Sequence, residues 1–108
     1  MRTALALTAL VFCLSQAAFA SDVSALWAKR CKSCHGVDGK ADTKMGHKHK
    51  VPDMTSAKFK ADPKHTDAWM KDAIANGVKN TKMKAYKSRL SPAEIDSLVA
   101  YVRTLQAK

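Results

Sequence analysis

Apolar residues in this chain recur at the three- and four-residue spacing of an amphipathic helix, most clearly near the C-terminus. The segment Ser91-Pro92-Ala93-Glu94 has the form of a capping box with proline at the first helical position, so it predicts where that helix begins. A helix of this kind must pack against another element, and we expect a helix near the N-terminus to be its partner. The apolar stripe along one face of this predicted helix consists of Ile95, Leu98, Val99, Val102 and Leu105.

A second helix is predicted near the N-terminus. Ser21 or Asp22 is able to cap it, and it runs toward Cys31. Its apolar positions fall at helical spacing, so one face is predicted to be buried. These positions are Val23, Leu26 and Trp27.

A third helix is predicted within residues 62–77. Asp62-Pro63 and Thr66 both offer a start, and Asn76-Gly77 offers a stop. No stretch of the chain alternates between apolar and polar residues as a half-buried strand does. The sequence therefore predicts an all-α fold.

Two polar stretches, 36–50 and 78–89, lack apolar periodicity and are predicted to be surface loops. The first contains Met45, His47 and His49, which are metal-ligating residue types, although an exposed loop holds a metal ion poorly. The second contains Met83. A methionine in a polar loop between two helices is unusual, and it suits contact with an apolar, metal-centred group.

The first twenty residues have the pattern of a secretory signal peptide. Arg2 supplies a positive start, and Ala18-Phe19-Ala20 supplies a cleavage signature. The apolar segment between them is shorter than the roughly 20 residues that a membrane span needs. We therefore expect residues 1–20 to be cleaved, leaving residues 21–108 as one periplasmic domain without a membrane span. A retained N-terminal anchor is the alternative.

Removal of the signal also removes Cys13, and both remaining cysteines lie in Cys31-Lys32-Ser33-Cys34-His35. C-x-x-C-H is the attachment pattern of c-type haem. Residues three apart on a helix lie on one face, so two thiols are able to reach the two vinyl groups of one porphyrin. The following histidine is then able to turn its imidazole to the iron. We predict one covalent haem c, attached through Cys31 and Cys34, with His35 as an iron ligand.

Three other interpretations of the cysteine pair are weaker. A structural zinc site needs four ligands, and the chain has no second cysteine pair. A thioredoxin-like redox motif needs a βαβ context, which the pattern does not show. A structural disulfide would leave His35 without a role.

The size of the domain also favours a bound group. A mature chain of about 88 residues has a marginal core, and a haem supplies a large apolar surface against which it can pack. We therefore expect the chain without haem to fold poorly.

Pro52 stiffens a segment whose carbonyl is able to accept a hydrogen bond from the ring N–H of His35. The predicted haem-pocket residues are Pro52, Met54, Trp69 and Ile74.

Charge is the other strong feature of the composition. The chain has 19 Lys and Arg against 9 Asp and Glu, which gives a formal net charge of +10. Such a surface favours solubility, and it also accelerates association with an acidic partner protein. Nucleic acid is a poor candidate partner for an exported chain that lacks interleaved basic and aromatic residues. An anionic membrane surface remains an alternative.

These residues together resemble class I c-type cytochromes along nearly all of residues 21–108. The resemblance implies a small cytochrome c fold of three to five helices around one haem, with the N- and C-terminal helices packed across each other. It implies that Met83 is the sixth iron ligand and that the Pro52 carbonyl accepts from His35. Lys84 stands where the family has proline, which implies a less rigid loop and a more labile methionine–iron bond. The matching segments are Trp27-x-x-x-Cys31-x-x-Cys34-His35-Gly36, Pro52-Asp53-Met54-Thr55, Gly77, Met83-Lys84-Ala85-Tyr86, Leu90-Ser91-Pro92-Ala93-Glu94-Ile95 and Leu98-x-x-Tyr101-Val102.

The resemblance further implies an electron-transfer protein and not an enzyme. With histidine and methionine on the iron, no position is open to a substrate, and methionine raises the reduction potential. We expect a monomeric carrier that docks transiently on acidic redox partners. Two alternatives remain: a haem subunit of a larger redox complex, and a peroxidase or gas-sensing haem from which Met83 is displaceable.

Overall fold

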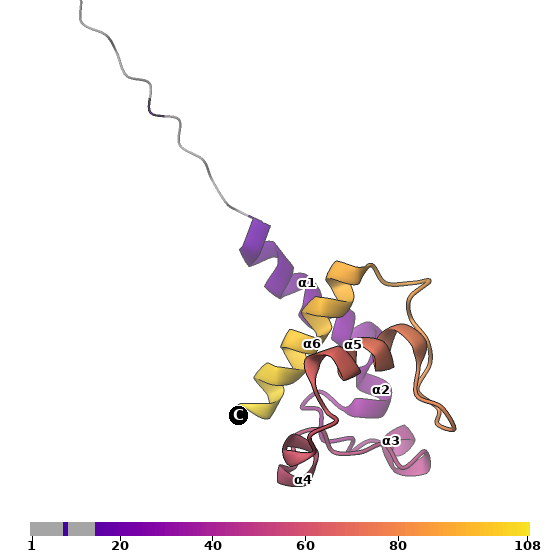
Figure 1. The fold of residues 1–108 in the computed structure, drawn as a ribbon. Coiled ribbons are helices and arrows are strands. Elements are labelled where there is room, and N and C mark those ends of the chain that lie inside the picture. Colours follow the sequence, from indigo (N-terminus) through magenta and orange to yellow (C-terminus); the bar gives the residue numbers. More distant parts are fainter. Residues whose placement is uncertain (1–7, 9–14) are drawn as a thin grey trace, which may run out of the picture.

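The computed structural model describes residue 8 and residues 15–108, and within these residues every regular element is a helix (Figure 1). The all-α prediction is confirmed. The described part contains six helices, against the three to five that were predicted. In chain order they are α1 (Ser15–Arg30), α2 (Lys32–His35), α3 (Lys44–Lys48), α4 (Ala57–Ala61), α5 (Asp67–Asn76) and α6 (Pro92–Gln106).

The N- and C-terminal helices pack across each other as predicted, and α5 packs against α6 as well (Figure 1). The capping box is formed: Glu94 N–H donates to Ser91 Oγ at 3.1 Å, and Ser91 N–H donates to Glu94 Oε1 at 2.9 Å. All five residues of the predicted α6 stripe are buried. They share one core with Trp27, Met54, Phe59, Met70 and Leu90.

The predicted start of α1 was wrong. The helix begins at Ser15, and not at Ser21 or Asp22. The intervening residues are rich in alanine, the strongest helix former, and nothing in them stops a helix. The predicted signal peptide falls largely on residues 1–7 and 9–14, which lie outside the described residues, as does Cys13.

The short helices α3 and α4 were not predicted. Residues 36–50 were expected to form a loop throughout, yet Thr43 caps α3 by accepting from Gly46 N–H at 2.8 Å. Ser56 caps α4 in the same way, accepting from Phe59 N–H at 3.1 Å. Each helix has only five residues, which is too short for apolar periodicity to reveal it.

The third predicted helix is confirmed as α5, which uses Thr66 and not Asp62-Pro63 as its start. Thr66 Oγ1 accepts from Trp69 N–H at 3.1 Å, and Gly77 ends the helix. Residues 78–89 contain no helix or strand, as predicted. Within the described part of the chain, no helix is both long and apolar enough to cross a membrane.

Candidate functional site

The Cys31–His35 segment lies where α1 passes into α2. Cys31 N–H still donates to the carbonyl of Trp27 at 2.9 Å, and His35 N–H donates to the carbonyl of Cys31 at 2.9 Å. The two cysteines are therefore separated by one helical turn. Both are free thiols and both are half-buried, so they remain available for bonds to another group.

Trp27 holds the chain immediately after this segment. Its indole Nε1–H donates to the Gly36 carbonyl at 2.9 Å, and this hydrogen bond is buried. Its ring centroid lies 5.9 Å from that of His35 and 5.3 Å from that of Tyr101 on α6. Gly36 turns the backbone at φ +80°, a conformation that few other residues adopt. Trp27 is buried as predicted, whereas its hydrogen bond to Gly36 was not predicted.

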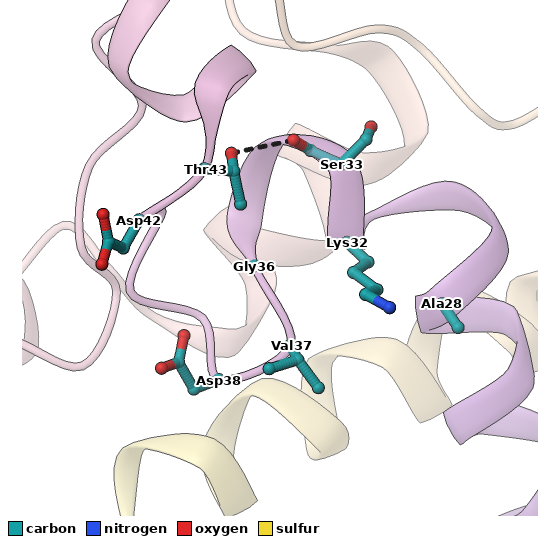
Figure 2. Close-up of a pocket in the computed structure, with 8 residues that line it drawn as sticks. All are labelled: Ala28, Lys32, Ser33, Gly36, Val37, Asp38, Asp42 and Thr43. Carbon is teal, nitrogen blue, oxygen red and sulfur yellow. Dashed lines mark hydrogen bonds between the residues drawn. The ribbon is translucent and has the colours of Figure 1, made fainter.

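Helix α3 supports the other side of the segment. Thr43 Oγ1 donates to the carbonyls of Ser33 at 2.8 Å and Cys34 at 3.1 Å (Figure 2). A Cβ on Gly46 would lie 2.7 Å from the Cys34 carbonyl oxygen, so glycine allows α3 to approach α2 closely. An open pocket of about 490 Å³ lies beside this contact; Figure 2 labels the residues that line it. The pocket is lined by Ala28, Lys32, Ser33, Gly36, Val37, Asp38, Asp42 and Thr43, and not by the two cysteines or His35.

The environment of His35 suits a metal ligand. Burial lowers the pKa of His35, so the imidazole is neutral at neutral pH, the form that binds iron. Its Nδ1 is buried and has no hydrogen-bond partner among the described residues. A buried polar atom without a partner costs about 1–3 kcal/mol, so a hydrogen bond to this nitrogen would stabilise the site.

The hydrogen bond predicted between His35 and the Pro52 carbonyl is therefore not formed in this structure. The segment around Pro52 is held elsewhere. Met54 N–H donates to the Gly39 carbonyl at 3.1 Å, and Gln106 Nε2–H donates to the Met54 carbonyl at 2.9 Å. These contacts leave Pro52 exposed.

The cysteines do not have the chemistry of the rival interpretations. Burial raises the pKa of the Cys31 thiol to about 11, and the neighbouring Cys34 charge adds to the rise. A redox-active cysteine pair needs a lowered pKa, so this environment argues against a thioredoxin-like motif. Among the described residues, no group of three or more His, Cys, Asp or Glu is placed to hold a metal ion.

Tyr86 ties the loop that carries Met83 to the C-terminal parts of α5 and α1. Tyr86 N–H donates to the Ile74 carbonyl at 2.9 Å, and Tyr86 Oη–H donates to the Arg30 carbonyl at 3.3 Å, directly before Cys31. Burial raises the pKa of Tyr86, so this hydroxyl stays protonated and able to donate. The tyrosine thus joins the Met83 loop to the cysteine segment, a link that the sequence did not reveal.

Gly77 brings Met83 close to the end of α5. It has φ +76°, and a Cβ on it would lie 2.7 Å from the Met83 carbonyl oxygen. Met83 N–H donates to Thr81 Oγ1 at 3.1 Å, and the Met83 side chain is half-buried. Met83 is therefore held by its own backbone contacts, although Lys84 follows it in place of proline.

The other predicted pocket residues lie in or against the core. Met54 is buried, and Trp69 and Ile74 are half-buried against the core cluster. Met70, which lies in α5, is buried in the core, whereas the candidate Met45 is exposed. His47 is exposed and contacts Asp42 at 2.8 Å, and His49 is half-buried.

Asp53 makes a local contribution to folding stability, and this contribution depends on pH. A hydrogen bond from the Thr55 hydroxyl at 2.6 Å, then the Thr55 N–H and the charge of Lys40, hold the pKa of Asp53 below its usual value, although burial opposes them. The stabilisation is therefore present above pH 3.8, the usual pKa of an aspartate, and is lost as pH falls through the lower pKa of the folded state.

Asp53→Asn should lower the free energy of unfolding by about 0.5–1 kcal/mol at pH 7 and by less near pH 3, as measured by urea unfolding. Thr55→Val should remove part of the same stabilisation, so the two substitutions should not be additive; a pH-independent effect of Asp53→Asn would contradict this assignment.

Comparison with known proteins places these residues in context. The family model described as "Cytochrome c" matches residues 20–106. A solved structure described as "KustC0563 c-type cytochrome" is 31% identical, with a TM-score of 0.68, and the match covers 77% of this chain and 95% of the other. A search of curated proteins found no match.

Proposed function

The chain belongs to the cytochrome c family, whose members transfer electrons through covalently bound haem c, and from this premise we propose that it is an exported one-electron carrier. Cys31 and Cys34 would form the two thioether bonds to a single haem. His35 and Met83 would bind its iron. One observation carries this assignment: the Tyr86–Arg30 hydrogen bond at 3.3 Å ties the Met83 loop to the residue before Cys31.

The residues of the chain supply what such a carrier requires. When bound, the haem supplies a one-electron iron couple. The neutral His35 imidazole donates to a metal without needing to lose a proton. A methionine ligand stabilises the reduced metal and raises the potential. Two protein ligands leave no open position for a substrate, so the arrangement favours electron transfer over catalysis.

Exposed lysines surround the two segments that would hold the haem. None of them forms an ion pair within the described part of the chain. Their positive charge would steer an acidic partner toward a small, transient interface, since complementary charge raises association rates more than affinity. These residues are Lys29 and Lys32 beside the cysteines and Lys79, Lys82, Lys84 and Lys87 beside Met83.

The charge of this surface is testable with small oxidants of opposite sign. The rate at which ferricyanide oxidises the reduced holoprotein should fall on the order of tenfold from low to high ionic strength, because salt screens the attraction. The rate with a cationic cobalt(III) complex should instead rise with salt. Lys84→Gln should lower the ferricyanide rate at low salt, and Lys58→Gln on α4 should not. Ferricyanide rates that do not change with salt would contradict the proposal.

A further inference from the structure

The only asparagine that precedes a glycine in this chain, Asn76, is the last residue of α5, and Gly77 begins the loop that follows (Figure 1). In such a pair the backbone nitrogen of the glycine is able to attack the side-chain amide carbon of the asparagine, because glycine has no side chain to obstruct the approach. Asn76 is exposed, so water reaches the product of this attack. The other asparagine of the chain, Asn80, is followed by Thr81.

The peptide bond between Asn76 and Gly77 lies just beyond the contacts that hold the end of α5. The carbonyls of Ile74 and Ala75 accept hydrogen bonds from the following loop at 2.9 Å and 3.1 Å. The Asn76 carbonyl and the Gly77 N–H, by contrast, bond to none of the described residues. The residues that end α2, α3, α4 and α6 each donate their N–H to a preceding carbonyl. The Gly77 nitrogen is therefore unengaged, and only the last turn of α5 must open for it to reach the Asn76 side chain.

One side-chain contact opposes this opening. Asp72, one turn earlier on α5, accepts a hydrogen bond from Asn76 Nδ2 at 2.7 Å. Side-chain pairs of this kind at a four-residue spacing stabilise a helix. The bond holds the Asn76 amide back along the helix, and the Asp72 carboxylate disfavours the negative charge that develops on the attacking nitrogen. Asp72 is exposed and forms no ion pair with a described residue, so this hydrogen bond is its main contact.

We propose that Asn76 is a deamidation site whose rate is set by its hydrogen bond to Asp72. The Gly77 nitrogen, after losing its proton, forms a bond to Asn76 Cγ, and the amide nitrogen takes up a proton and leaves as ammonia. Water then opens the resulting succinimide ring at either of its carbonyls and yields aspartate or isoaspartate. The reaction consumes only water, so the proposal stands independently of the proposed function.

Deamidation should weaken the end of α5. The new carboxylate lies at the C-terminus of a helix, where the helix dipole disfavours negative charge. It also replaces the donor to Asp72 by a second carboxylate, and like charges four residues apart destabilise a helix. Isoaspartate, in addition, lengthens the backbone by one carbon before Gly77. The modified chain is therefore less positive than the original and less stable at this helix end.

The modification is tested by ageing the oxidised full-length holoprotein in mildly alkaline buffer and mapping its peptides by mass spectrometry. Trypsin separates residues 72–79, which contain Asn76, from residues 80–82, which contain Asn80. The first peptide should convert with time into aspartate and isoaspartate forms, the latter detected as methyl acceptors for an isoaspartate methyltransferase. The second peptide should keep its amide. Loss of the Asn76 amide that is no faster than loss of the Asn80 amide would overturn the proposal.

The restraint by Asp72 is tested with Asp72→Ala, which should lose the Asn76 amide severalfold faster than the wild type. The matched control Asp42→Ala removes an exposed carboxylate outside α5 and should deamidate at the wild-type rate. Equal rates in Asp72→Ala and the wild type would overturn the role of the hydrogen bond. The effect on stability is read from Asn76→Asp, which should unfold at a lower urea concentration than the wild type, whereas Asn76→Gln should not.

Discussion

Met83→Ala should abolish the long-wavelength sulfur-to-iron charge-transfer band of the oxidised holoprotein. The reduced variant should bind carbon monoxide rapidly, because one axial position is then open. Its reduction potential should fall by on the order of 0.1 V, a fraction of the ~0.8 V range over which axial ligands set haem potentials. The measurements are a visible spectrum of each oxidation state and a potentiometric titration.

Met45→Ala is the matched control for this substitution. Met45 is exposed on α3, so its removal should leave the band and the potential unchanged. An unchanged spectrum in Met83→Ala would show that Met83 is not the ligand. Attention would then turn to the other methionines and histidines: Met54 and Met70 are buried in the core, His49 is half-buried, and Met45 and His47 are exposed.

Gly77→Ala should lower the free energy of unfolding by about 2 kcal/mol and weaken the methionine–iron bond. Gly77 has φ +76°, which alanine adopts only with strain. The added Cβ would also lie 2.7 Å from the Met83 carbonyl oxygen, so the loop must move. Urea unfolding of the holoprotein measures the first effect, and the intensity of the sulfur-to-iron band measures the second.

Asn80→Gly provides a control in the same loop. Asn80 has φ +63°, a conformation that glycine adopts without strain, so stability should change by less than about 0.5 kcal/mol and the band should persist. Wild-type stability in Gly77→Ala would contradict the close approach of Met83 to the end of α5. Equal losses in both variants would mean that the loop tolerates no change at all, and would remove the specific role given to Gly77.

The elements predicted well are those with signals inside one segment. The α6 cap and its apolar stripe follow from neighbouring residues, and so do the Thr66 start and Gly77 end of α5. The cysteine spacing likewise specifies its own geometry, because one helical turn separates Cys31 from Cys34. Local hydrogen bonding and helix periodicity are sufficient for such features.

The features that were missed depend on contacts between distant segments. The close approach of α3 to α2 requires Gly46 opposite Cys34, and the Met83 loop is tied to α1 through Tyr86. The expected His35–Pro52 hydrogen bond failed for the same reason, since contacts of Met54 with Gly39 and Gln106 determine where that segment lies. A single sequence carries no pattern that pairs these positions.

The central claim is that one haem is bound covalently by both Cys31 and Cys34, and peptide mapping of the denatured holoprotein tests it most directly. Trypsin cuts after Arg30, Lys32 and Lys40, which would separate residues 31–32 from residues 33–40. We predict that all haem absorbance elutes with residues 31–40 as one species, which stays joined even when the bond after Lys32 is cut. In Cys34→Ala, residues 33–40 should elute without haem. Two separate wild-type peptides without haem absorbance would contradict the account.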